Sequence, residues 1–457
     1  MARSLEELVN STPNIVEMLR NAPVGPNVYP GVLPEYTNWR DEQEAWQRTC
    51  ILFDLSYHMV DLALEGPGAL DLLSHVAFNS FEGFGVNQAK HLAPCSYDGY
   101  VIGDVILFGL GSESFNLVGR APALNWIRYH AESGGFDVTW DWDERTLLRK
   151  DQSQRRSYRF QLQGPTALDI VEKALGARPQ DVKFFHMTTF DIASRSVRAL
   201  RHGMVGQPGF ELFGPWAERE PVLEALLKAG EEFGLLRAGS RAYSSNTLES
   251  GWIPSPLPAV YTGASMKDYR EWLPADGYEA SASVGGSFVS DDVEDYYLTP
   301  WDLGYGKFVR FNHEFIGRAA LKEMSLNPSR TKVTLALFKE DVLSVIGSQF
   351  EQGPRAKFME FPSAVYAMHP YDAVLVKGET VGLSTWIGYS SNERKMLTLA
   401  ILDTEYAEPG TEVTLLWGEE DGGSAKSAVE RHEQFEIRAT VGPVPFAHYA
   451  RESYRVD

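Results

Sequence analysis

A repeated stretch is the feature of this chain that most restricts its fold. Leu64-Glu-Gly-Pro-Gly-Ala-Leu-Asp-Leu-Leu73 is echoed by Leu162-Gln-Gly-Pro-Thr-Ala-Leu-Asp-Ile-Val171. Each copy predicts a strand, a Gly-Pro turn and a helix. Each is followed downstream by a further strand candidate, residues 115–120 after the first copy and residues 210–215 after the second. The repeat therefore predicts two similar α+β halves produced by duplication, and a cleft between such halves is a usual place for a ligand.

Two side chains between His202 and Trp252 are candidates for a binding or catalytic site. Glu211 lies in the alternating run Phe210-Glu-Leu-Phe213 after a Gly-rich turn, which predicts an acid on a strand that faces a pocket. The duplication predicts that Arg120 and Glu211 occupy loosely corresponding positions. Tyr243 lies in a polar segment close to Arg241, and a tyrosine beside a fixed cation can act as a general acid or base. The ordinary alternatives are a solvent-facing strand position for Glu211 and a half-buried aromatic for Tyr243.

The rest of the pattern divides the chain into three parts. Residues 262–290 are polar and Gly-rich, which predicts a long covering loop or excursion. After about residue 330, short strands separated by turn signals predict an all-β sandwich or barrel. We therefore predict an N-terminal arm with the first α+β half over residues 1–155, a second α+β half over 156–329, and a β domain over 330–457.

Composition limits the partners and the location. The net charge of −20 and the scattered Lys and Arg argue against nucleic acid, and an anionic substrate would need a local cation. The two cysteines, Cys50 and Cys95, have no metal-ligand or redox spacing, which favours reduced thiols in a cytoplasmic protein. The sequence shows no signal peptide and no apolar run of transmembrane length, so we expect no membrane partner.

Several well-known motifs do not occur in the sequence. It contains no Gly-x-Gly-x-x-Gly that opens a helix after a strand, no phosphate-binding loop, no His-Glu-x-x-His and no Gly-x-Ser-x-Gly. These absences disfavour a nucleotide-dependent enzyme and a metal-dependent hydrolase, and we expect no metal site.

The chain resembles the tetrahydrofolate-dependent aminomethyltransferases of the glycine cleavage system over nearly its whole length. The residues that carry the resemblance are Gly209-Phe-Glu211, Leu162-Gln-Gly-Pro165, Leu52-Phe-Asp54 with Ser56-Tyr-His-Met59, and Gly304 through Phe315-Ile-Gly-Arg318. The resemblance implies an α+β fold, the aminomethyltransferase folate-binding fold, with two ferredoxin-like halves plus a C-terminal β-barrel around a central folate site. That architecture agrees with the repeat and with the β-rich tail.

The departures from that family point to a different substrate. The glycine-cleavage enzymes have a Gly-Gly-x-x-Asp-Asp element, whereas Gly99-Tyr-Val-Ile-Gly-Asp104 has Gly103 in place of one aspartate. Arg120-Ala121 replaces their Asn-Ala, and a longer segment with Tyr243 replaces their compact Gly-x-Arg-Asp. A site that loses a carboxylate and gains an arginine and a tyrosine suits an anionic aromatic substrate better than an aminomethyl group.

Other stretches are similar to those of the bacterial aromatic O-demethylases of this family, which act on vanillate and syringate in the catabolism of lignin-derived aromatics. These stretches are Asn27-Val-Tyr-Pro30, Ser56-Tyr-His-Met-Val60, Val118-Gly-Arg-Ala-Pro122, Arg201-His-Gly-Met204 and Ser240-Arg-Ala-Tyr243 through Leu248-Glu-Ser-Gly-Trp-Ile-Pro-Ser-Pro256. This resemblance implies transfer of a methoxybenzoate methyl group to N5 of tetrahydrofolate, which gives 5-methyltetrahydrofolate and a phenolic acid.

The same resemblance implies a role for seven side chains. Tyr243 would be the acid near the ether oxygen, and Arg120 would pair with the substrate carboxylate. Tyr29 and His58 would contact the ring hydroxyl or neighbouring oxygens. Glu211 would hydrogen-bond the pterin ring, and Gln163 and Trp252 would help to form the folate pocket. Each has an ordinary alternative: Arg120 as a structural ion-pair partner, His58 as a satisfied histidine, Gln163 as a turn residue and Trp252 as a core residue.

Three other functions stay open at this level. The chain could be the aminomethyltransferase of glycine cleavage itself, which Gly103 and the Tyr243 segment disfavour. It could demethylate a sulfonium compound, for which a phenol acid is unnecessary, or it could bind folate without catalysis. The sequence also leaves open whether syringate, vanillate or 3-O-methylgallate would be preferred, with a weak preference for syringate.

Overall fold

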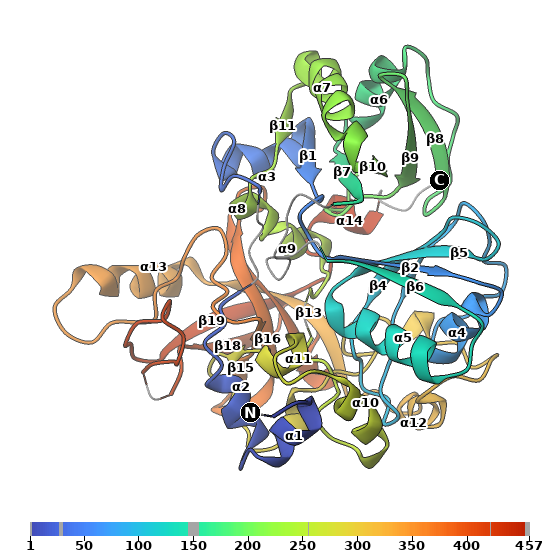
Figure 1. Ribbon diagram of the computed structural model, residues 1–457. Coiled ribbons are helices and arrows are strands. Elements are labelled where there is room, and N and C mark those ends of the chain that lie inside the picture. Colours follow the sequence, from blue (N-terminus) through green and yellow to red (C-terminus); the bar gives the residue numbers. More distant parts are fainter. Residues whose placement is uncertain (1, 27–30, 145–154, 255, 421, 453–457) are drawn as a thin grey trace.

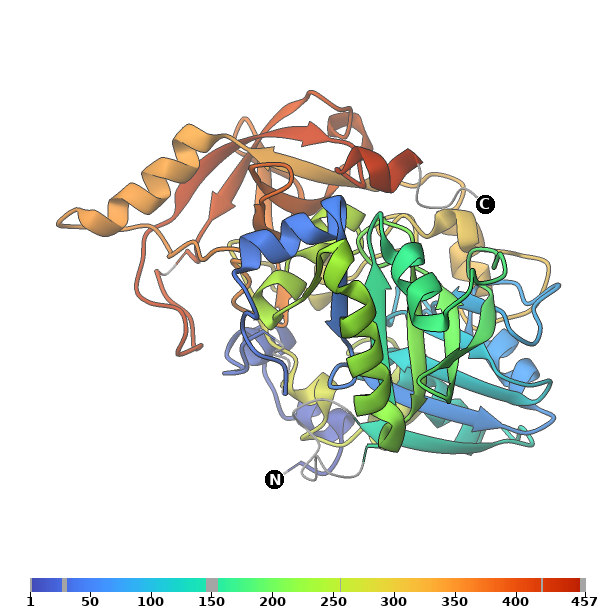
Figure 2. The same ribbon diagram turned by 90° about the horizontal axis from the view of Figure 1, so that it is seen from above.

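The computed structural model has three parts, which Figure 1 colours blue-cyan, green and orange-red along the chain. It describes residues 2–26, 31–144, 155–254, 256–420 and 422–452. Two parts are α+β layers, each a sheet covered by helices, and the third is a β-barrel. Figure 2, seen from above, shows the barrel on one side of the two α+β parts.

The first sheet has the strand order β3-β4-β5-β2-β6 and is antiparallel throughout. Helices α4 (Ala69–Val76) and α5 (Ala121–Ser133) belong to this part. The four strands β2, β4, β5 and β6 with these helices make the ferredoxin-like βαββαβ arrangement. The strands are β2 (Val60–Glu65), β3 (Ala89–Leu92), β4 (Val105–Gly109), β5 (Ser114–Gly119) and β6 (Thr139–Glu144).

The second sheet repeats this order, with one inserted strand that the sequence does not reveal. Its order is β11-β1-β7-β10-β9-β8, and its helices are α6 (Ala167–Leu175) and α7 (Arg219–Gly230). The place that β6 takes beside β2 is taken here by β1, which comes from the N-terminal part of the chain and pairs with β7. The strands are β1 (Cys50–Asp54), β7 (Ser157–Gln163), β8 (Met187–Ile192), β9 (Arg195–Arg201), β10 (Gly209–Pro215) and β11 (Leu235–Arg237). The two ferredoxin-like halves are thus interlocked, and the boundary after residue 155 stays a prediction.

The repeated Gly-Pro turn has the same geometry in both halves. Gly66 and Gly164 have φ angles of 134° and 138°, which a residue with a side chain rarely adopts. A Cβ at Gly66 would lie 2.4 Å from the carbonyl oxygen of Asp137, and a Cβ at Gly164 would lie 2.5 Å from that of Thr49. Glycine is therefore required at both positions for the same reason. In each half, the backbone just before the neighbouring strand passes too close to the turn to leave room for a Cβ.

The expected correspondence between Arg120 and Glu211 is wrong. Phe115 pairs with Leu64 in the first sheet, and Phe210 pairs with Leu162 in the second, so these two pairs are equivalent. Glu211 follows its phenylalanine directly, whereas Arg120 comes five residues after Phe115, beyond the end of the strand. The two side chains therefore occupy opposite ends of equivalent strands.

The C-terminal part is a closed barrel with the strand order β13-β17-β16-β15-β18-β19. Helix α13 (Lys339–Gly347) leaves it after β13 and extends away from the other two parts in Figure 1. The barrel encloses its own apolar cluster, which includes Leu335, Leu415 and Ile437. The prediction of a β-barrel is confirmed. Its strands are β13 (Arg330–Leu337), β15 (Asp372–Val376), β16 (Glu379–Ser390), β17 (Lys395–Asp403), β18 (Glu412–Trp417) and β19 (Phe435–Gly442).

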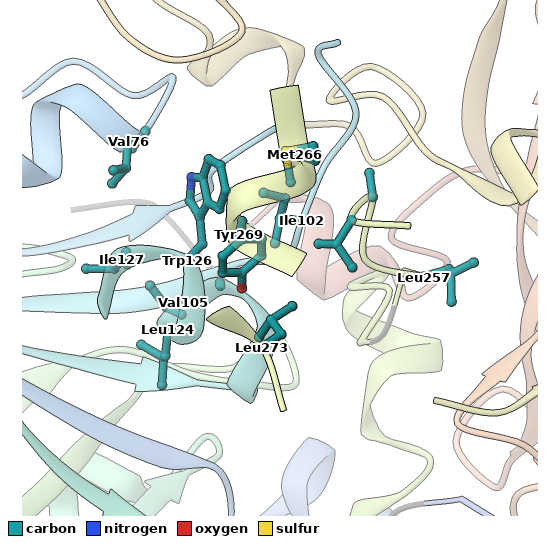
Figure 3. Close-up of a cluster of buried hydrophobic side chains, with 14 of the residues drawn as sticks. Val76, Ile102, Val105, Leu124, Trp126, Ile127, Leu257, Met266, Tyr269 and Leu273 are labelled. Atoms are coloured by element: carbon teal, nitrogen blue, oxygen red, sulfur yellow. The ribbon is translucent and has the colours of Figure 1, made fainter. Parts of the chain in front are cut away.

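The segment predicted as a long covering loop or excursion, residues 262–290, is not a plain loop. It contains helices α10 (Lys267–Trp272) and α11 (Tyr278–Ser281) and the short strand β12 (Val284–Gly285), which pairs with β14 (His369–Pro370). Although the segment is polar in composition, two of its side chains are buried: Tyr269 and Met266 are each 1% exposed. Figure 3 shows these side chains packed against Trp126 and neighbouring residues of α5. This packing fixes α5, at whose N-terminus Arg120 lies.

Shorter helices complete the chain. They are α1 (Leu5–Asn10), α2 (Ile15–Arg20), α3 (Trp39–Arg48), α8 (Ser240–Tyr243), α9 (Asn246–Ser250), α12 (Arg318–Met324) and α14 (His448–Glu452). Among the described residues, no helix combines the length and the apolar character that crossing a bilayer requires.

Candidate active site

A cavity of about 930 Å³ lies where the three parts meet. The first half contributes residues of β3, β4 and β5, the second half contributes β10 and the loop after β9, and the barrel contributes Thr331 and Lys332 of β13. Its volume is near the upper end of the range of about 300–1,000 Å³ that ligand pockets span. Five of the seven side chains predicted for the site line it, namely His58, Arg120, Glu211, Tyr243 and Trp252.

Three of these side chains form one corner of the cavity. Tyr243 ends α8, and its ring meets the His58 ring edge to face with 5.2 Å between the centroids. Arg120 is the N-cap residue of α5 but makes no side-chain capping bond, and it forms no ion pair or hydrogen bond with any described residue. Burial, together with the positive charge of Arg120, holds the pKa of His58 well below its usual range. The corner thus combines a phenol, a neutral imidazole and an uncompensated guanidinium.

The cation that the sequence suggested beside Tyr243 has another partner. Arg241 donates to Glu35 at 2.7 Å and to the carbonyl oxygen of Phe361. It therefore ties α8 to the N-terminal arm and to the barrel part. Asn246 donates to the main-chain oxygen of Tyr243 at 2.7 Å, which fixes the end of α8. The positive charge at this corner comes from Arg120 instead.

The low pKa of His58 leads to a pH prediction. A free imidazole gains a proton as the pH falls through about 6.5, but His58 in the folded protein stays neutral there because its pKa is lowered. We expect the ring carbon-bound proton signals of His58 in an NMR titration to stay unchanged from pH 7.5 to pH 6. The same residue in urea-unfolded protein is the control and should titrate near 6.5. A folded-state midpoint at that value would contradict the assignment.

A buried ion pair forms part of another wall of the cavity. Arg159 on β7 donates to Glu211 Oε1 on β10 at 2.5 Å, and its other terminal nitrogen lies 3.5 Å from Asp61 Oδ2 on β2. Its guanidinium also lies over the rings of Phe108 and Phe213, at 4.8 and 4.9 Å. Arg159 thus joins the two sheets. No described residue donates to Glu211 Oε2, so this oxygen can accept an N–H group of a ligand.

Arg159 is therefore expected to be essential for stability. Arg159→Met would leave Glu211 and Asp61 buried without their shared cation, and removing one partner of a buried ion pair costs about 3–5 kcal/mol. Urea unfolding followed by tryptophan fluorescence measures the loss. Arg159→Lys is the matched control, because it keeps the charge and should lose less. Equal stability of Arg159→Met and the unaltered protein would refute this role.

Asp104 was not among the side chains predicted for the site, and its role becomes visible only in the folded protein. Asp104 Oδ2 accepts hydrogen bonds from His91 Nε2 at 2.6 Å, Trp252 Nε1 at 2.9 Å and the Tyr305 hydroxyl at 3.1 Å. These donors outweigh the effect of burial and lower the pKa of Asp104. All four side chains line the cavity. The indole of Trp252 is thereby oriented by a fixed carboxylate.

Gln163 and Tyr29 stand apart from the other predicted residues. Gln163 is fully buried and does not line the cavity; its Oε1 accepts from the backbone N–H groups of Met204 and Val205. It thus holds the loop after β9, which itself contributes Met204 to the cavity wall. Tyr29 lies outside the described residues, so its predicted contact with the substrate stays a prediction.

The charge of the cavity is opposite to that of the chain. Although the net charge is −20, basic side chains outnumber acidic ones on the cavity wall, and such a cavity favours anionic ligands. The basic residues are Lys90, Arg120, Arg159, Lys307, Arg310 and Lys332, and the acidic ones are Glu82, Asp104 and Glu211. Among the residues that the structure describes, no three His, Cys, Asp or Glu side chains gather in a way that could hold a metal ion.

Two ferredoxin-like halves and a barrel around one shared cavity define an α+β enzyme of the aminomethyltransferase type. The chain belongs to the GCVT family, since the model of the GCVT N-terminal domain matches residues 24–255. A solved structure of the glycine cleavage aminomethyltransferase T of Bartonella henselae has the same fold, with a TM-score of 0.61, 20% identity and 91% of each chain covered.

Relatives within the family differ in what they act on. The chain is 56% identical to a syringate O-demethylase of Sphingobium sp., over 99% of this chain and 98% of that protein. It is 32% identical to a sesamin methylene transferase of Sinomonas sp., over 83% and 82%. It is 27% identical to an aminomethyltransferase of Streptomyces avermitilis, over 82% and 84%. The similarity to the demethylase thus extends over nearly the full length of this chain, and the sequence identity is about twice that to the aminomethyltransferase.

Proposed function

We propose that this protein is a tetrahydrofolate-dependent O-demethylase that moves the methyl group of a methoxybenzoate, of the syringate or vanillate type, to N5 of tetrahydrofolate. The products are 5-methyltetrahydrofolate and a phenolic acid. One observation carries the proposal: Tyr243, a neutral His58 and an uncompensated Arg120 meet in one corner of the cavity that also contains Glu211. The full-length similarity to a syringate O-demethylase supports it and favours syringate.

The residues present fit tetrahydrofolate, which supplies the N5 nucleophile when it is bound. The Oε2 of Glu211, to which no described residue donates, can accept N–H groups of the pterin ring, and the ion pair with Arg159 holds that carboxylate in place. Trp252, oriented by Asp104, offers an aromatic wall. Gln163 acts through the loop that it holds and is a positioning residue.

The corner formed by Tyr243, His58 and Arg120 must stabilise a poor leaving group. Breaking the methyl C–O bond leaves a phenolate, and the balance of the reaction requires that oxygen to receive the proton lost from N5. Tyr243 donates a hydrogen bond or a proton to the ether oxygen as negative charge develops there. Arg120 holds the substrate carboxylate, bidentate by preference, and so aligns the methoxy carbon. His58, which is neutral, contacts the hydroxyl group on the substrate ring together with Tyr29.

An anaerobic assay tests the function. Purified protein is incubated with tetrahydrofolate and with syringate, vanillate or 3-O-methylgallate, and 5-methyltetrahydrofolate is followed by mass spectrometry. We expect formation of 5-methyltetrahydrofolate and the demethylated acid in equal amounts, fastest with syringate. Absence of transfer from every methoxybenzoate would exclude the proposal.

The same preparation distinguishes the alternatives. Turnover of a methylamine-loaded lipoyl protein would identify an aminomethyltransferase, and turnover of an aliphatic sulfonium compound would identify a sulfonium demethylase. Folate binding without any turnover would identify a binding protein. A tetrahydrofolate-dependent reaction and two free, buried cysteines favour a cytoplasmic location.

A further inference from the structure

Glu249 on α9 is a buried carboxylate that the proposed mechanism does not use. It is 0% exposed, and its hydrogen-bond donors among the described residues are all neutral groups. Trp46 Nε1 of α3 donates to Oε2 at 2.7 Å, and the Ser390 hydroxyl at the end of β16 donates to Oε1 at 2.5 Å. Asn392 Nδ2 lies 3.2 Å from both oxygens, and the Tyr449 hydroxyl of α14 donates to Oε2. This set, which we call the Glu249 anchor, joins the N-terminal arm, α9, the barrel and the C-terminal helix.

Tyr449 is the donor that the C-terminal helix contributes. Burial, followed by the negative charge of Glu249, raises the pKa of Tyr449 well above its usual range, so the hydroxyl keeps its proton and donates. Helix α14 lies next to α9 (Figure 1) and packs closely on the loop after β9, since a Cβ at Gly206 would lie 2.4 Å from the Cβ of Ala450. The last turn of the chain is therefore held against two segments that border the cavity.

Helix α9 connects the Glu249 anchor to the reacting corner. The helix begins shortly after Tyr243, and Asn246 at its start donates to the main-chain oxygen of Tyr243. Asn246, Ser250 and Trp252 line the cavity, whereas Glu249 does not. A shift of α9 would therefore move both the phenol of Tyr243 and the indole of Trp252 relative to bound substrates, and a misplacement of about 1 Å can cost about 10²-fold in rate.

We propose that Tyr449 is a positioning residue for methyl transfer, which acts through Glu249 and α9 to hold Tyr243 at the ether oxygen. The inference rests on the proposed function for the identity of the reaction, and it adds a part for the C-terminal helix. Tyr449 does not line the cavity, so it should influence the rate of transfer and leave substrate affinity unchanged.

Tyr449→Phe tests the role because it keeps the ring and removes only the hydroxyl. We expect kcat to fall about tenfold, while KM and the dissociation constants for syringate and tetrahydrofolate change by less than about twofold. Single-turnover transfer should keep its amplitude and lose rate, whereas a partly unfolded protein would lose amplitude. Tyr366→Phe is the matched control, because it removes a hydroxyl that donates to the main-chain oxygen of Phe358 away from the cavity, and it should leave kcat unchanged.

A double-variant cycle separates positioning from a general loss of stability. If Tyr449 acts through Tyr243, Tyr449→Phe should cause little further loss in a protein that already carries Tyr243→Phe, whereas independent effects would multiply. An excess of enzyme over syringate makes the slow residual transfer measurable. Ser390→Ala removes a donor from the other oxygen of Glu249 and carries the same test if Tyr449→Phe does not fold. An unchanged kcat in Tyr449→Phe, or an equal fold loss in both backgrounds, would overturn the inference.

Hydrogen exchange tests the Glu249 anchor without any turnover. Tyr449→Phe should speed the amide exchange of peptides that cover residues 240–252, and Tyr366→Phe should not. If the unaltered protein transfers no methyl group, the proposed function fails, and the exchange comparison decides on the Glu249 anchor by itself. Normal transfer by the unaltered protein, together with an unchanged kcat in Tyr449→Phe, would reject only the positioning role.

Discussion

Tyr243→Phe is expected to abolish methyl transfer almost completely while both substrates still bind. The change removes one hydroxyl and keeps the ring that packs on Phe53 and His58, so the fold and the cavity should be preserved. General acid catalysis by a positioned group contributes about 10²–10⁴-fold, and we expect kcat to fall by that factor. Single-turnover transfer from syringate to tetrahydrofolate measures it, with dissociation constants for both ligands determined separately.

His58→Phe provides a comparison for Tyr243→Phe, because His58 is proposed to contact the substrate without donating the critical proton. It should raise KM more than it lowers kcat. If Tyr243→Phe transferred methyl groups at an undiminished rate, the acid would have to be another group on the cavity wall, and Tyr243 would be an aromatic wall residue only.

Arg120→Met is expected to raise KM for syringate by roughly 10²-fold with a smaller change in kcat. Hydrogen bonds to charged groups contribute about 1.5–3 kcal/mol each, and a guanidinium offers two to a carboxylate. The side chain makes no capping bond to α5, and the packing in Figure 3 holds that helix, so the substitution should leave the fold unchanged. Steady-state kinetics with varied syringate measure the effect.

The control for Arg120→Met uses the substrate rather than another residue. Syringaldehyde lacks the carboxylate, so the unaltered protein should process it poorly, and Arg120→Met should process it no worse. The dissociation constant for tetrahydrofolate should stay unchanged. A KM for syringate that did not respond to the substitution would assign Arg120 a role other than carboxylate recognition.

Local patterns predicted the repeated halves because the Gly-Pro turn imposes the same backbone requirement at Gly66 and Gly164. They could not predict that β1 takes the position in the second sheet that β6 takes in the first, since strand pairing across a hundred residues has no local signature. The helices of residues 262–290 were missed for a similar reason. Their amphipathic character depends on a few aromatic anchors, such as Tyr269, within a polar sequence.

The site was predictable to a different degree from residue to residue. The strand pattern, the repeat and the polar segment pointed to Glu211, Arg120 and Tyr243, and the family resemblance implied their roles. The structure brings all three to one cavity. It did not lead to Asp104, whose donors His91 and Tyr305 are brought to it only by the fold.

The most direct test of methyl transfer follows the methyl group itself. Syringate with fully deuterated methoxy groups is mixed with tetrahydrofolate and protein under anaerobic conditions, and the folate product is analysed by mass spectrometry. We expect 5-methyltetrahydrofolate that carries three deuterium atoms, because the methyl carbon moves intact from oxygen to N5. A folate product with two deuterium atoms, as methylene transfer would give, or an unlabelled folate beside demethylated syringate, would contradict it.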